Sequence, residues 1–176
     1  NAFTNIMAKC NLRMAYKICK EIKKKHSIYE RLKDKLNLKE EEIKEWKEVA
    51  SKIRININEK NVIEQFDGYF KLKNVTLTKT DENGIPLIPT KIKAKDLGKT
   101  QLVKQADVLM LIALLPEIFS KKTKTANYDF YISKTVHKSS LSPSTHALMA
   151  CEVGDLHRAY DLFNVSLNAD ISNLYG

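Results

Sequence analysis

The strongest constraint on the fold is a set of helical segments on either side of a long stretch without helical period. Apolar residues recur three or four positions apart over residues 1–25, which predicts a helix. Opposite charges three or four apart over residues 27–52 predict a second, solvated helical zone. Residues 53–92 carry two prolines and the turn dipeptide Asn83-Gly84 instead. Because long irregular stretches in compact domains tend to be functional, we expect a functional loop there, extending to about residue 99.

Helical patterns return after Thr100. Residues 101–116 are strongly apolar and must end at Pro116, because proline cannot sit far inside a helix. Three further helices are expected, over residues 123–133, over residues 143–152 and from residue 155 onward. The chain is therefore predicted to be all-α. Periodicity alone leaves a toroid, a solenoid and a bundle of helices open.

Length and composition describe a globular chain. The 176 residues suffice for one domain or for a piece of a larger one, and 43% are hydrophobic against 29% charged. The longest apolar run, Val108–Pro116, is far shorter than the ~20 residues that span a bilayer, so no membrane helix is expected. No secretory signal is expected either, although the chain begins with Asn1 and its natural start can lie upstream.

The positive charge does not indicate a nucleic-acid partner. Of the 30 basic residues behind the net charge of +9, 26 are lysines and only 4 are arginines. Base recognition and bidentate phosphate contacts depend on arginine, so we expect the lysines to lie on a solvated surface. The odd number of cysteines and the lack of a CxxC pair predict reduced thiols and a cytoplasmic protein.

The most informative polar stretch lies just before a predicted helix start. His137, Ser139, Ser140 and Ser142 precede Pro143, which fits the first turn of a helix. Hydroxyls, an imidazole and free backbone N–H groups at the positive end of a helix suit an oxyanion such as phosphate. A polar capping turn, with Ser142 as the cap, would give the same pattern and is the commoner case.

Two further stretches combine polar groups with apolar surroundings. Lys104 and Gln105 stand at the head of the most apolar helix, where an ammonium and an amide can hydrogen-bond a sugar, or simply form a solvated first turn. Residues 64–70 alternate acidic and amide groups with aromatics, as carbohydrate sites do, or form a loop pinned by its aromatic side chains. Neither pattern alone decides between these alternatives.

Other chemistries are not supported. His26, His146 and His157 are expected to be structural, and the nearest histidine pair, His137 and His146, lies nine positions apart. That spacing does not suit a metal site. The sequence also lacks the glycine-rich motifs of nucleotide sites and the GxSxG motif of serine hydrolases. We therefore expect no metal and no organic cofactor.

These stretches, taken in order, resemble the catalytic domain of glycoside hydrolase family 65, which includes maltose, trehalose and kojibiose phosphorylases. The resembling pieces are residues 1–8, 65–70, 103–108 and 135–143, with a tail at Gly154–Tyr160 and Asp170-Ile171. The resemblance implies that residues 1–176 form one segment, roughly half of an (α/α)6 barrel. The first half of the barrel and the flanking β domains would then be absent.

The resemblance also implies roles for single residues. His137, Ser139 and Ser140 match the stretch that holds phosphate, and Lys104 and Gln105 match the pair that contacts the glucosyl unit. The catalytic general acid, a glutamate, is expected upstream of Asn1, so this chain contains no catalytic residue and would be inactive alone. Lys138 departs from the family, in which many members carry an acidic residue at this position.

The expected reaction is that of an inverting phosphorylase, converting an α-linked glucose disaccharide and phosphate into β-glucose 1-phosphate. Phosphate, already an anionic nucleophile, would be the co-substrate, and a homodimer is one option for the whole protein. The alternatives are a hydrolase of the same family and a non-catalytic helical binding or scaffold protein. A phosphate site favours phosphorolysis over hydrolysis, while the missing acid motivates the scaffold alternative.

Overall fold

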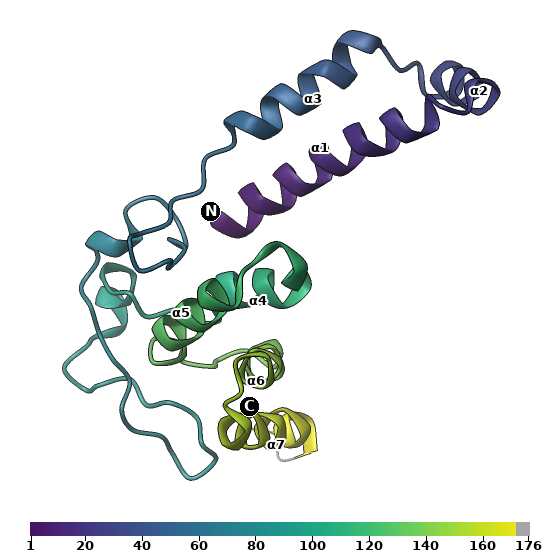
Figure 1. The fold of residues 1–176 in the computed structure, drawn as a ribbon. Coiled ribbons are helices and arrows are strands. Elements are labelled where there is room, and N and C mark those ends of the chain that lie inside the picture. Colours follow the sequence, from purple (N-terminus) through teal and green to yellow (C-terminus); the bar gives the residue numbers. More distant parts are fainter. Residues whose placement is uncertain (172–176) are drawn as a thin grey trace. The chain divides into compact units, whose positions relative to one another are not determined.

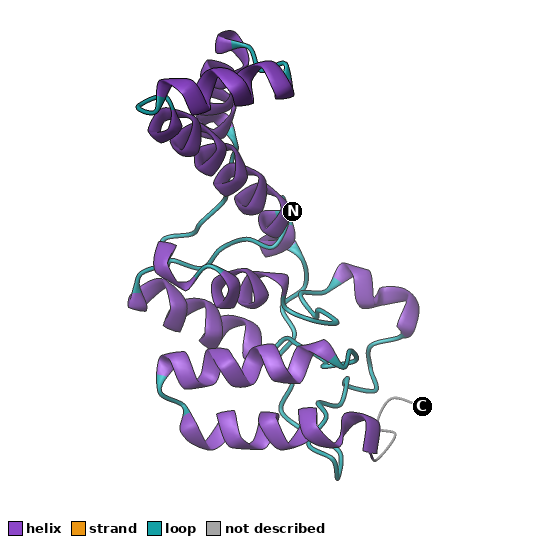
Figure 2. Ribbon diagram, turned by 90° about the vertical axis from the view of Figure 1, so that its right-hand side faces the viewer, coloured by secondary structure: helices purple, strands orange, loops and turns teal. Residues whose placement is uncertain are grey.

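A computed structural model describes residues 1–171, apart from the side chain of Asp170, which therefore cannot be compared with the expected tail. The chain divides into two compact units, residues 1–55 and residues 56–176. Both units are built from helices and loops (Figures 1 and 2). Within residues 1–171, extended pairing is limited to isolated β-bridges. The all-α prediction is confirmed.

The first unit contains α1 (Ala2–Ile22), α2 (His26–Leu36) and α3 (Glu40–Lys52). The predicted helical zone at 27–52 is thus two helices, separated where Asn37 adopts a left-handed conformation. Helices α1 and α3 pack together. The end of α3 returns to the start of α1, where the Asn5 side chain donates to the carbonyl of Arg54 (2.9 Å). The pair buries Ala2, Ile6, Ile43 and Ala50.

The second unit contains α4 (Asp107–Leu114), α5 (Lys121–Ile132), α6 (Leu141–Val153) and α7 (Leu156–Ile171). Helix α6 packs against the other three. Most side chains of α6 are buried, and small ones such as Ala147 and Ala150 allow this close approach. Gly154 ends α6 in the left-handed conformation that glycine adopts without strain, as the sequence predicted.

The long irregular segment is also confirmed. Between residues 53 and 99 the only helical pieces are the 3-10 turns η1 (Tyr69–Lys71) and η2 (Ala94–Lys99). A short hairpin, residues 79–87, is closed by a bridge between Thr80 and Pro86. No side chain between residues 76 and 99 is buried, and within residues 1–171 the hydrogen bonds of residues 78–98 stay within residues 78–100. Little therefore fixes this segment to the helices.

The helix expected over residues 101–116 begins only at Asp107, so its predicted start was wrong. The backbone of residues 101–103 pairs elsewhere. Gln101 donates to the Lys73 carbonyl (2.9 Å), and Val103 donates to the Lys134 carbonyl (3.0 Å). These pairings hold the chain extended until Ala106. The predicted end is nearly correct, because α4 stops at Leu114, two residues before Pro116, where the short turn η3 (Pro116–Ile118) follows.

Buried polar groups of α5 anchor the start of the long segment. The Asn127 side chain is completely buried, accepts from the backbone N–H of Ile63 (2.9 Å) and donates to the carbonyl of Asn61 (2.9 Å). The Tyr131 hydroxyl donates to the carbonyl of Ile63 (2.6 Å). Tyr69 stacks on the Tyr131 ring, with centroids 6.0 Å apart. The three hydrogen bonds give partners to backbone groups of Asn61 and Ile63, which lie outside any helix or sheet.

Two neutral histidines lie in the core of this unit. His137 is 3% exposed and His146 is 1% exposed, and their rings meet edge to face with centroids 4.5 Å apart. Burial lowers the pKa of His137 to about 3, and His146 and Arg158 contribute by charge repulsion. Burial lowers the pKa of His146 to about 4, although its bond to the Ser142 carbonyl opposes this. Both rings are therefore uncharged at neutral pH.

Replacing Asn127 by leucine should destabilise the second unit by about 3 kcal/mol, because the buried N–H of Ile63 and the partly buried carbonyl of Asn61 would both lose their partner. Urea unfolding followed by circular dichroism measures this loss. Asp129→Leu is the matched control, since Asp129 lies exposed on the same helix. Equal effects of the two substitutions would contradict the anchoring role of Asn127.

Stability should fall by about 2.5 kcal/mol between pH 7 and pH 5.5. Both folded-state pKa values lie below the unfolded value of ~6.5, so only the unfolded chain takes up protons as the pH falls through this window. Urea unfolding at the two pH values measures the change. His146→Gln should roughly halve it, and His157→Gln, on an exposed residue, should leave it unaltered. A pH-independent free energy of unfolding would contradict the burial of uncharged histidines.

Candidate functional site

The structure brings the two predicted binding stretches together. Val103 and Thr135 form a parallel bridge, in which the carbonyl of Val103 accepts a hydrogen bond from the backbone N–H of Val136 (2.9 Å). The residues that follow Val103 lead into α4, and those that follow Thr135 lead into α6. Lys104-Gln105 and the turn formed by residues 137–140, termed the phosphate turn below after the role that the sequence predicts for it, therefore lie beside each other at the starts of two helices.

His137 is held rigidly in the phosphate turn. Its φ of 50° is left-handed, a conformation in which histidine is enriched among non-glycine residues. Its Nδ1 lies 2.9 Å from the Ser142 hydroxyl. Ser142 is not the helix cap, because α6 begins at Leu141 after Ser140, whose side chain forms no capping bond. The capping alternative therefore does not hold for Ser142, whose hydroxyl is engaged by the imidazole.

His146 completes a buried chain of polar groups. Its Nδ1 faces the carbonyl of Ser142 at 2.8 Å, so this nitrogen must carry the ring proton. Its Nε2 lies 3.2 Å from the Thr135 hydroxyl, which donates its proton to the carbonyl of Tyr131 (2.9 Å). This series of polar groups runs from His137 through Ser142 and His146 to Thr135, and it joins the phosphate turn to the residue that bridges to Val103.

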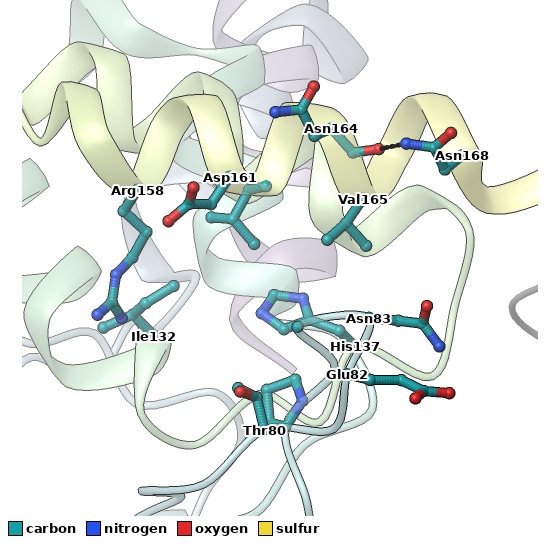
Figure 3. A pocket seen from close by; sticks show the side chains of 13 residues that line it. Thr80, Glu82, Asn83, Ile132, His137, Arg158, Asp161, Asn164, Val165 and Asn168 are labelled. Atoms are coloured by element: carbon teal, nitrogen blue, oxygen red, sulfur yellow. Dashed lines mark hydrogen bonds between the residues drawn. The ribbon is translucent and has the colours of Figure 1, made fainter.

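Two cavities open at this end of the second unit. The first, about 790 Å³, is lined by Lys104 and Lys138 and by apolar side chains such as Leu102 and Val136. The second, about 680 Å³, is lined by His137 and Arg158 together with asparagines of α7 (Figure 3). Lys104 and His137 thus line neighbouring cavities rather than one. Ser139 and Ser140 line neither.

The hairpin 79–87 lies between these cavities. Asp81 and Ile85 line the cavity of Lys104, whereas Thr80, Glu82 and Gly84 line the cavity of His137 (Figure 3). Asn83 lines the cavity of His137 as well, so all three residues of the hairpin turn, 82–84, face that cavity. Gly84 also approaches α7, since a Cβ built on it would lie 3.6 Å from Val165.

The remaining predicted residues, Gln105 and those of the stretch 64–70, line neither of these two cavities. Gln105 lines a narrow crevice between α4 and α6 together with Ser142 and His146. The carboxylates of Glu64 and Asp67 both accept from the Asn56 side chain, at 2.7 and 3.0 Å. The pinned-loop alternative describes residues 64–70 well at Tyr69, which is 1% exposed, but not at Phe66, which is exposed.

Sequence reasoning missed several residues of this region. Arg158 is one of four arginines and lies in a helix whose pattern gives no sign of a site. Asp81 and Ile85 reach the cavity of Lys104 only through the path of the irregular segment, which no period reveals. The four-residue spacing of Ser142 and His146 was visible, since such residues share a helix face. The chain that they form with His137 depends on the left-handed turn.

Negative findings apply to residues 1–171. No cluster of three or more histidine, cysteine, aspartate or glutamate side chains that could hold a metal ion occurs there. None of the helices described combines the length and the apolar character needed to cross a bilayer. Cys10, Cys19 and Cys151, all within the same range, are unpaired.

Comparison with known proteins gives matches over the whole chain. Residues 1–176 match the glycosyl hydrolase family 65 central catalytic domain. The chain is 44% identical to a kojibiose phosphorylase of Caldanaerobacter subterraneus subsp. tengcongensis, with 100% of this chain and 23% of the relative covered. It is 36% identical to an α,α-trehalose phosphorylase of Thermoanaerobacter brockii, with 98% and 22% covered.

A solved structure agrees. A protein from the human microbiome, described as a candidate kojibiose phosphorylase, superposes with a TM-score of 0.79 at 30% identity, covering 98% of this chain and 23% of that one. The chain thus spans about a quarter of the length of the relatives that it matches. With the family match over its full length, this chain belongs to glycoside hydrolase family 65, whose phosphorylases are its homologues, and its helices form part of the (α/α)6 catalytic domain.

Proposed function

We propose that residues 1–176 are part of an inverting phosphorylase that acts on an α-linked glucose disaccharide. A phosphate oxygen attacks the anomeric carbon of glucose, the glycosidic C–O bond breaks, and a general acid protonates the departing sugar oxygen. The products are β-glucose 1-phosphate and the second sugar. The observation that carries the proposal is the pairing of Val103 with Thr135, which puts both predicted binding stretches side by side in a member of this family.

The residues of this chain would bind and orient the substrates. Lys104 and Gln105 contact the glucosyl unit, and His137, Ser139 and Ser140 hold phosphate. The general acid is a glutamate outside residues 1–176, and losing such an acid typically lowers the rate by ~10²–10⁴-fold. Residues 1–176 alone should therefore be inactive. The reaction uses phosphate as its co-substrate, and we place it in the cytoplasm, where the cysteines stay reduced.

The hairpin 79–87 has to move for this reaction. Reacting atoms must come within about 3–3.5 Å of each other. In the structure, however, the hairpin lines both the cavity of Lys104 and the cavity of His137. Since none of its side chains is buried, its displacement costs little. We propose that substrate binding displaces the hairpin and joins the two cavities.

Kojibiose is the disaccharide to test first, because relatives named kojibiose phosphorylase are 44% and 43% identical to this chain. The protein that contains residues 1–176, at its natural length, should release glucose 1-phosphate from kojibiose and phosphate. Trehalose and maltose are assayed in parallel, and proton NMR identifies the anomer. Release of free glucose alone would indicate a hydrolase, and no turnover of any disaccharide would favour a binding or scaffold protein.

A reversible tether tests the movement of the hairpin. A Cβ built at position 84 would lie 3.6 Å from Cγ2 of Val165, so a cysteine at position 165 whose Sγ takes the place of that Cγ2 can form a disulfide with a cysteine at position 84. Oxidation of the G84C/V165C variant should lower phosphorolysis at least tenfold, and reduction should restore it. Each single variant, oxidised and reduced in the same way, controls for strain at Gly84 and for Cys151, which is exposed. Full activity of the disulfide-bonded form would show that the hairpin need not move.

A further inference from the structure

We infer that Ser142 is a positioning residue, whose hydroxyl holds His137 in the tautomer with its proton on Nε2, so that His137 meets phosphate as a hydrogen-bond donor. This inference rests on the proposed function, in which the phosphate turn binds phosphate. Ser142 itself touches no substrate in this account. It acts only through the ring of His137.

The direction of the hydrogen bond follows from where the hydroxyl proton of Ser142 can go. Ser142 is 2% exposed, so its proton needs a partner within the protein. In the described part of the chain the partner of its Oγ is Nδ1 of His137, at 2.9 Å. The hydroxyls of Ser144 and Thr145 instead donate to the carbonyl of Leu141, at 3.1 and 3.0 Å. Ser142 therefore donates to Nδ1, which must be unprotonated.

The backbone of Ser142 prevents an alternative arrangement of the rings. Its carbonyl accepts from Nδ1 of His146 (2.8 Å), and the His146 ring packs edge to face against His137. The same residue thus fixes one histidine through its carbonyl and the other through its hydroxyl. Because His137 is 3% exposed and its backbone is left-handed, its ring has little freedom to turn over.

The hydrogen bond from Ser142 determines the state of the other ring nitrogen of His137, Nε2. A neutral imidazole carries one N–H, and with Nδ1 acting as acceptor this N–H must be at Nε2. The ring lines the cavity that also contains Arg158 (Figure 3). His137 can then offer phosphate a directed N–H, while the positive charge comes from other residues. The opposite tautomer would present a lone pair to an anion, which repels it.

The test compares two serine variants of the natural-length protein. Ser142→Ala should raise the KM for phosphate about tenfold, the effect of one hydrogen bond of about 1.4 kcal/mol. The KM for the disaccharide should change less than twofold. Ser144→Ala, which removes a hydroxyl from the same helical turn, should change neither constant. Ser142→Thr keeps the hydroxyl and should restore phosphate binding, and thermal unfolding verifies that each variant folds.

A second readout tests the tautomer without activity. In protein labelled with ¹⁵N-histidine, and with His137→Gln used for assignment, Nδ1 of His137 should show the shift of an unprotonated nitrogen and Nε2 that of an N–H. A proton on Nδ1 would overturn the inference, as would a phosphate KM unchanged in Ser142→Ala or raised equally in Ser144→Ala. Absence of phosphorolysis in the wild type would instead count against the proposed function, and the ring shifts would then decide the inference.

Discussion

The arrangement of this end of the molecule depends on one short backbone pairing. Val103 exchanges hydrogen bonds with the segment 134–136, and this contact holds two stretches that lie more than thirty residues apart in sequence. Each stretch then enters a helix, α4 or α6, so the starts of both helices lie near this pairing. Without the pairing, Lys104 and the phosphate turn would have no fixed relation. Main-chain geometry thus places these two stretches beside each other.

The charged side chains and the buried polar side chains of this region are different residues. The histidines are too deeply buried to carry charge at neutral pH, so in the proposed site His137 would orient an anion through a hydrogen bond rather than attract it by charge. Positive charge comes from Lys104, Lys138 and Arg158, which lie at the cavity walls. Such a division suits a ligand that must be attracted from solution and then oriented. Lys138, which lines the same cavity as Lys104, adds a further positive charge there.

The sequence predicted the helices well because their signals are local. Gly154 had to end a helix, and Pro116 had to prevent one from continuing, for steric reasons that need no tertiary context. The start of α4 was wrong because residues 101–103 pair with residues distant in sequence, and propensity cannot show such contacts. The candidate residues came from polar stretches and motif resemblance, whereas the cavity walls formed by the hairpin depend on how the irregular segment runs. No period or motif encodes that path.

The segment between residues 76 and 99 has an evolutionary consequence. Since it buries no side chain, its length and sequence can change without loss of the helical core. Its hairpin nevertheless forms walls of both cavities. Under the proposed function, mutations there would reshape the space around the second sugar while the helices keep the binding residues in place. A single scaffold can in this way diversify toward new acceptors at almost no cost in folding stability.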